Sequence, residues 1–384
     1  MLEASAHNQL KKILHGTSCP WPHNLTLSRL VGRTLRRQDN SLIQMEIGSQ
    51  ESWWLGLLIP LCFYHSRSVL VLSEKQHRRL FKIEMPRLNQ EGLNLPSWEG
   101  KEPPPDGQLW VIDHAGLLDA FHQGYLKSKH LIVPEAELLS ERLRDAMALE
   151  IKAEHWEELR RAHPSVNIEL MHLYERLSRR LFSESTRIDS HVKMDSSALI
   201  AVQDIIGLLG PSPSPWSDLF RFGSQHWASW AELDHKTLNW TWNSKILEPF
   251  KNLQGLLKGQ PVLFLTATGE NASLTSQFES VDFPLDVKVT LGGPLLQEPI
   301  ALFAPRRQPL PNTEFYAQHL LNQSRRLILG LKGVTILLLD DDQLRRQLTS
   351  ELAAEFGKRI VHELTSPESN GVICCRWSWW LLNQ

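Results

Sequence analysis

Short apolar segments alternate with longer helical patterns in the first third of the chain, and this alternation constrains the fold more than any other feature. Strand patterns occur at 41–47, 68–72, 108–113 and 130–133. An apolar helix is expected at 52–64 and a basic helix at 74–82. Strands that alternate with helices at this spacing are typical of βαβ units, whose strands pair in parallel. The sequence therefore predicts an α/β fold built on a parallel sheet.

The pattern changes after Pro134. Residues 134–184 carry dense charge, with apolar residues at i, i+3 and i+4, which predicts an antiparallel pair of helices turning at 163–165. A further helix is expected at 196–209, followed by a linker rich in Pro and Ser. Strand patterns then resume at 261–266, 299–303, 335–339 and 371–375. This layout is two α/β halves around a helical insertion.

The overall composition excludes several classes of protein. There are 41 Lys and Arg against 43 Asp and Glu, a net charge of −2, so any nucleic-acid binding needs a local basic groove. Four cysteines without a CxxC spacing favour a reduced, cytoplasmic environment over a disulfide scaffold. The most apolar run, 53–64, is interrupted by Gly56 and Pro60 and is too short to span a bilayer. We therefore expect a cytoplasmic protein without a membrane segment.

The loop after the first strand pattern is the first candidate site. Ligands of parallel sheets bind at the carboxyl ends of the strands. Residues 48–52 keep Gly48 and Ser52 of a phosphate-binding P-loop, but they lack its Lys, and Glu51 would repel a polyphosphate. A plain turn with helix-start residues is the alternative interpretation.

A second candidate follows the strand pattern at 108–113. The run 111–116 is similar to the helicase motif hydrophobic-hydrophobic-Asp-Glu-Ala-His, whose Asp holds Mg²⁺ and whose Glu positions the attacking water. Asp113 matches the Asp, which makes it a possible Mg²⁺ ligand, and His114 replaces the catalytic Glu. The alternative for Asp113 is a helix cap.

A third candidate is the run Thr266-Ala267-Thr268 after a buried strand pattern. It resembles the Ser-Ala-Thr motif that couples the nucleotide pocket to the DNA groove in superfamily 2 helicases. The preceding run 230–263 resembles the approach to that motif in the DinG/XPD branch.

Other segments follow the order of that branch of helicases. They resemble the adenine-recognition region, motif Ia, the entry to the second lobe, motif IV and motif V, at 21–44, 69–80, 310–315, 334–356 and 371–380. The insertion stands where the branch carries its iron–sulfur and arch elements. No Cys lies between Cys62 and Cys374, so no iron–sulfur cluster is expected. Motif VI, with its arginine finger, does not appear.

The resemblance implies two RecA-like lobes of the P-loop NTPase type: 1–133 and 196–275 form the first, 134–195 is the helical insertion, and 276–384 is the second. It also implies ATP with Mg²⁺ as cofactor and single-stranded DNA as partner. Thr266, Thr268, Arg306 and Arg307 are the residues expected near the nucleic acid.

Trp230 and Trp242 are candidate stacking surfaces among 14 Trp, although buried packing is the commoner use of this residue. The missing Lys, catalytic Glu and arginine finger favour a helicase-related pseudoenzyme with weak or absent ATP hydrolysis. The alternative is a non-catalytic scaffold that binds a protein partner through exposed Trp. The acidic run Asp340 to Asp342 is expected to cap a helix.

Overall fold

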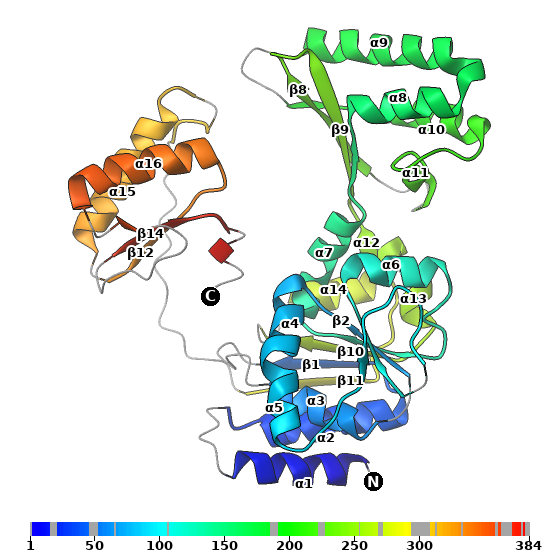
Figure 1. Ribbon diagram of the computed structural model, residues 1–384, viewed down its shortest axis with the longest axis vertical. Coiled ribbons are helices and arrows are strands. Elements are labelled where there is room, and N and C mark those ends of the chain that lie inside the picture. The colour runs from blue at the N-terminus through cyan, green and yellow to red at the C-terminus, as the bar shows by residue number, and fades with distance from the viewer. Residues whose placement is uncertain are drawn as a thin grey trace. The chain divides into compact units, whose positions relative to one another are not determined.

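The computed structural model describes most of the chain: residues 2–15, 21–45, 53–64, 67–105, 107–184, 191–221, 227–252, 254–267, 272–292, 308–311, 313–331, 333–357, 360–361, 371–377 and 379–380. The chain divides into two compact units (Figure 1). The first contains residues 1–184 and 190–298, and the second contains the remainder. The predicted strand at 299–303 lies outside the described residues.

A seven-stranded sheet forms the centre of the first unit, and all its pairings are parallel. The strand order is β11 (Val287–Leu291), β1 (Ser41–Met45), β10 (Val262–Thr266), β5 (His130–Val133), β2 (Ser68–Val71), β4 (Leu109–Ile112) and β3 (Ser97–Trp98). The central strands are buried on both faces, which explains why they are continuous apolar runs. The predicted α/β class is confirmed.

Helices cover both faces of this sheet (Figure 1). One face packs against α2 (Asn24–Arg37), α3 (Trp54–Cys62) and the continuous run α4 (Glu74–Arg79), η1 (Leu80–Glu84) and α5 (Met85–Gln90). The helix α1 (Leu2–Leu14) packs against α2 and α3. The other face packs against α6 (His114–His122), α7 (Leu139–Ala146), α12 (Pro249–Asn252), α13 (Gln254–Lys258) and α14 (Ala272–Ser280). Successive residues of a strand therefore pack into different hydrophobic cores. In β1, Ile43 packs against the helices of the first face and Leu42 against those of the second.

The insertion is a mixed element with its own sheet. The strands β6 (Leu149–Ile151), β9 (Asn239–Ile246), β8 (Trp227–Asp234) and β7 (His191–Lys193) pair antiparallel in that order. Four helices pack against this sheet: α8 (Ala153–Ala162), α9 (Asn167–Glu184), α10 (Ser196–Leu209) and α11 (Asp218–Arg221). Their shared core contains four buried Trp, at positions 156, 216, 240 and 242. The helix pair turns at Pro164–Val166, as predicted.

The expected boundaries differ from this arrangement. The insertion was expected at 134–195, but α7 packs against the large sheet, while β8 and β9 complete the sheet of the insertion. β11 falls within 276–384, the range expected for the second lobe, yet it pairs with β1. Periodicity identifies strands and helices, but it does not specify the partners of a strand, and those partners decide where each part of the fold ends.

The second unit contains a three-stranded parallel sheet in the order β12 (Thr335–Leu338), β14 (Val372–Cys375) and β13 (Ile360–Val361). The helices α15 (Tyr316–Gly330) and α16 (Asp342–Phe356) pack against it. Asp341 caps α16 by accepting hydrogen bonds from the N–H groups of Gln343 and Leu344. Asp342 forms an ion pair with Arg376, so the acidic run is structural, as expected.

Within the part of the chain that the structure describes, no helix combines the length and the apolar character needed to cross a bilayer.

We expect Gly56→Ala to lower the free energy of unfolding by about 1–3 kcal/mol, because it overpacks the contact between α2 and α3. A Cβ at this position would lie 2.8 Å from Leu27 Cδ2 and 3.2 Å from the carbonyl oxygen of Asn24. Urea denaturation measures the change. Gly255→Ala in α13 is the matched control, since its Cβ would lie at an ordinary 3.6 Å from Phe121, and it should be neutral or stabilising. Equal stability of the two variants would contradict the expectation.

Candidate functional site

The strand connections locate a ligand site at the carboxyl edge of the large sheet. The chain leaves β1 towards α3 on one face, and it leaves the neighbouring strand β10 towards α14 on the other. In parallel α/β folds, ligands bind beside such a switch of direction, in a crevice outside the carboxyl ends of the two strands. The predicted positions Gly48, Ser52 and Thr268 belong to the loops after these strands and lie outside the described residues.

Asp113 does not lie beside this crevice. Its strand, β4, is separated from β1 by β10, β5 and β2. At about 4.8 Å per strand, the ends of β4 and β1 are roughly 19 Å apart. The Asp113 carboxylate instead accepts a 2.7 Å hydrogen bond from the Gly116 N–H and caps α6. The structure therefore corrects the predicted catalytic and Mg²⁺-binding role of Asp113, and its alternative role as a cap is found.

His114 is buried beside the capped helix end. Burial lowers the pKa of its imidazole to about 4, the nearby Arg142 adds to this effect, and Asp113 and Glu135 oppose it. Its Nε2 has no hydrogen-bond partner among the described residues. A neutral imidazole of this kind does not replace the carboxylate of a catalytic Glu.

The strand order draws attention instead to the loop after β5, the strand next to β10. This loop keeps the hydrophobic pair, the Glu and the Ala of the helicase motif hydrophobic-hydrophobic-Asp-Glu-Ala-His. The matching run is Ile132-Val133-Pro134-Glu135-Ala136-Glu137. Pro134 stands at the position of the metal-binding Asp, and Glu137 at that of the His. The sequence alone did not reveal this match, because the run around Asp113, after β4, also resembles the motif. The pair Glu135-Ala136 after a buried strand is the sequence pattern that indicates this match.

Glu135 is held by three donors. Arg142 forms an ion pair with its carboxylate at 2.7 Å, and the Ser73 hydroxyl and the Gln76 amide donate hydrogen bonds at 3.0 Å each. The Glu135 backbone has φ +54°, a left-handed conformation that costs a non-glycine residue about 1 kcal/mol. The surrounding hydrogen bonds offset this cost and fix the carboxylate in place.

Glu137 connects this loop to the Thr-Ala-Thr segment. Its carboxylate accepts a hydrogen bond of 3.4 Å from the N–H of Ala267. Burial raises the pKa of Glu137, and the neighbouring Glu135 acts in the same direction. The loops after β2, β5 and β10 are thus joined by one polar network.

The residues of this network do not fit a Mg²⁺–nucleotide site. Pro134 supplies no ligand, and the carboxylate of Glu135 is already neutralised by Arg142. Within the described ranges, no three His, Cys, Asp or Glu side chains are grouped so that they could hold a metal ion. Mg²⁺ is usually bound by one or two protein carboxylates, with phosphate oxygens and water as its other ligands. Here the carboxylate of Glu135 is already paired with Arg142.

Thr266 and Trp242 cannot contact nucleic acid directly, which corrects their predicted roles. Thr266 is fully buried in β10, opposite Gln44 of β1. Trp242 is 1% exposed and belongs to the core of the insertion. Trp230 is half-buried on β8. Arg306 and Arg307 lie outside the described residues.

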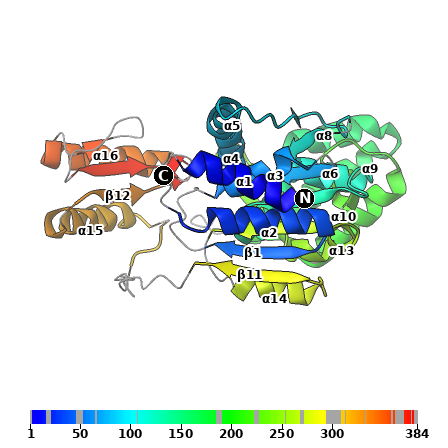
Figure 2. The same cartoon turned by 90° about the horizontal axis from the view of Figure 1, so that it is seen from below.

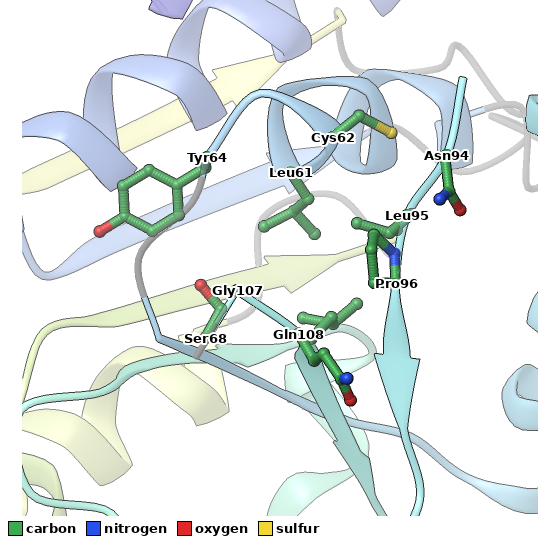
Figure 3. A pocket seen from close by; sticks show the side chains of 10 residues that line it. Leu61, Cys62, Tyr64, Ser68, Asn94, Leu95, Pro96, Gly107 and Gln108 are labelled. Atoms are coloured by element: carbon green, nitrogen blue, oxygen red, sulfur yellow. The ribbon is translucent and has the colours of Figure 1, made fainter. Parts of the chain in front are cut away.

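A small cavity of about 170 Å³ lies at the opposite edge of the sheet (Figure 3). It is lined by residues at the starts of β2 and β4, Ser68 and Leu109, together with Cys62 and Tyr64. Burial raises the pKa of the Cys62 thiol to about 12, so it is not a reactive nucleophile. This cavity is separate from the carboxyl edge and contains no catalytic pair.

No protein-family profile matches the sequence, and no curated protein is significantly similar to it. Among solved structures, the chain is similar to an apo structure of XPD, with a TM-score of 0.51 and 9% identity over 91% of this chain and 77% of that one. A second XPD helicase structure gives 0.48 and 8% identity over 92% and 79%. The DUF1998 helicase MrfA gives 0.39 and 8% identity over 97% and 51%. The first likeness shows that the chain shares the RecA-like α/β fold of that structure, and it selects no branch of proteins with this fold.

We expect His114→Gln to flatten the pH dependence of stability. Because the folded-state pKa of His114 lies below its ordinary 6.5, the unfolded chain binds more protons between about pH 6.5 and 4, and stability falls as the pH falls through this window. Each such histidine contributes up to about 1.4 kcal/mol per pH unit. His130, whose pKa is also lowered to about 4 by burial, leaves a residual slope.

Urea denaturation at a series of pH values across this window measures the effect. His172→Gln, at an exposed position of α9, is the matched control and should keep the slope of the parent. Identical slopes for His114→Gln and the parent would show that His114 is not buried as a neutral imidazole.

Proposed function

We propose that this chain is a helicase-related nucleic-acid-binding protein in which ATP hydrolysis is weak or absent. The observation that carries the proposal is the ion pair between Glu135 and Arg142 at the end of the strand next to β10. In an active helicase, the corresponding carboxylate positions the attacking water beside a metal-binding Asp. Here Pro134 replaces that Asp, and Arg142 brings an internal cation to the Glu.

The charge and geometry of Arg142 support the loss of hydrolysis. A guanidinium remains protonated at all physiological pH values and binds a carboxylate tightly. Glu135 also accepts hydrogen bonds from Ser73 and Gln76, so its oxygens are occupied in several directions. A base in this state has little capacity to orient or deprotonate water.

The nucleic-acid part of the proposal rests on the RecA-like helicase fold and on the polar network that reaches the Thr-Ala-Thr segment. In such proteins, single-stranded DNA is the expected partner. The alternative scaffold, with exposed Trp as anchors, has less support. Six Trp side chains are fully buried, at positions 53, 54, 110, 216, 240 and 242.

The purified chain should release phosphate from ATP no faster than a protein-free blank, with or without Mg²⁺ and single-stranded DNA. Phosphate release over time measures this. DNA-stimulated release that disappears on Glu135→Gln would contradict the proposal, whereas release that persists in that variant comes from a contaminant. Asp113→Ala should affect stability alone, by about 1 kcal/mol, because it removes a helix cap.

A labelled single-stranded oligonucleotide should bind at low salt, with log affinity falling against log salt by about 0.7 per phosphate contact. We expect the variant Arg306→Ala/Arg307→Ala to have a slope shallower by about 1.4 if both residues contact phosphates. Fluorescence anisotropy at several salt concentrations measures both quantities. Arg161→Ala/Arg176→Ala is the matched control, since it removes the same charge from exposed positions of α8 and α9. Absence of binding by the parent at low salt would contradict the nucleic-acid part of the proposal.

A further inference from the structure

The helix pair α1–α2 is a basic surface segment of an otherwise nearly neutral chain. Residues 2–39 contain six Lys and Arg but two acidic residues, whereas the whole chain has a net charge of −2. The six basic residues are all exposed: Lys11, Lys12, Arg29, Arg33, Arg36 and Arg37. The excess of positive charge is therefore at the surface of these two helices, where a polyanion could reach it.

The two helices pack closely and antiparallel. Glu3 near the start of α1 forms an ion pair with Arg36 near the end of α2, and His7 contacts Arg29 one turn further on. The close approach occurs at Gly32, where an added Cβ would lie 3.4 Å from the Cα of Glu3. Figures 1 and 2 both show α1 lying along α2, on the side away from the large sheet.

An open groove of about 440 Å³ runs between the helices. It is lined by Glu3, Ala4, His7, Asn8, Arg29 and Arg33. Arg29 and Arg33 are one helical turn apart, so they lie about 6 Å apart along the axis of α2. The groove therefore presents two guanidinium groups in a row along one wall.

Most of the positive charge on the α1–α2 surface is not neutralised. Arg36 and Arg37 form ion pairs with Glu3 and Asp39 at 2.7 and 3.8 Å. Within the described ranges, Lys11, Lys12 and Arg33 have no carboxylate at ion-pair distance.

Arg29 has a neutral neighbour, because its guanidinium donates a 3.1 Å hydrogen bond to Nε2 of His7, which must then be unprotonated. The pKa of His7 is lowered, first by burial and then by the charges of Arg29 and Lys11. The smaller part of this effect comes from Arg29 and Lys11, so both cations lie close enough to act on the His7 ring.

We propose that the α1–α2 surface binds the phosphate backbone of duplex DNA through Arg29, Arg33, Lys11 and Lys12. This inference rests on the proposed function and adds a second contact, separate from the carboxyl edge of the sheet. Arg and Lys are the residues that contact phosphates, and such contacts carry no sequence information. The surface is therefore expected to bind duplexes without regard to sequence.

The chemistry of the groove favours a duplex over a single strand or a membrane. Surfaces that bind single strands combine positive charge with aromatic rings for base stacking, and no Phe, Tyr or Trp lines this groove. A helix that lies in a membrane interface needs an exposed apolar face. The apolar face of α1, formed by Ala6, Leu10 and Ile13, is buried in the protein core instead.

Fluorescence anisotropy of a labelled duplex at salt concentrations between about 50 and 200 mM tests the proposal with the full chain. The variant Arg29→Ala/Arg33→Ala should bind more weakly, with a salt slope shallower by about 2, because each lost phosphate contact reduces the slope by about 1. Lys11→Ala/Lys12→Ala should give a similar change and provides a second route, since neither lysine has a side-chain partner among the described residues. Arg161→Ala/Arg176→Ala, which removes equal charge elsewhere in the same unit, should leave the slope unchanged.

The outcomes separate this inference from the proposed function. Duplex binding with the parent's slope in both α1–α2 variants overturns the inference, and so does binding of single-stranded but not duplex DNA, while the proposed function stands in both cases. Binding of vesicles that contain phosphatidylserine, without binding of either nucleic acid, overturns both. A shallower slope in both α1–α2 variants, with an unchanged slope in the control, supports the inference.

Discussion

The pairing of β1 with β10 is the contact on which the first unit depends. It joins residues on either side of the whole insertion, with Ser41 opposite Leu263. Asn40 fixes the start of this pairing: its side-chain oxygen accepts a hydrogen bond from the Val262 N–H, and its own N–H donates to Asp286 beside β11. Closing so long a segment costs little more entropy than closing one of half the length, which explains how the fold accommodates a separate sheet and its helices within one connection. Without this pairing, the two strands whose connections leave towards opposite faces of the sheet would not be neighbours.

At the carboxyl edge, the carboxylate of Glu135 is held in an internal ion pair. Arg142 reaches Glu135 from α7, and Ser73 and Gln76 reach it from the start of α4. The same network therefore holds together elements from both faces of the sheet. These groups are partly buried, so removing one member would leave the others short of hydrogen-bond partners and would lower stability.

Much of the fold followed from local pattern, but the site did not. Apolar runs predicted the core strands β1, β2, β4, β5 and β10 closely, and charge at helical spacing predicted the pair α8 and α9. Asp113 and Glu135 each follow a buried strand and precede a helix, so the sequence offers two similar positions for one role. Strand order separates them, because β5 lies next to β10 and β4 lies two places further away. Thr266 and Trp242 show the same limit, since a residue type indicates a capacity to contact nucleic acid, whereas its burial decides whether contact is possible.

The sequence by itself determined the α/β class, the parallel pairing implied by alternating strands and helices, the capping role of Asp341 and the near-neutral total charge. Each of these depends on residues close together in the chain or on a simple count. Only the tertiary structure decided which strands are neighbours, which of the Trp side chains are exposed, and where the cations gather. These properties depend on contacts between residues far apart in sequence: Gln76 meets Glu135 because β2 pairs with β5, and Arg29 meets His7 because Gly32 lets two helices approach. Periodicity carries no information about such contacts, since the same apolar spacing is compatible with many strand orders.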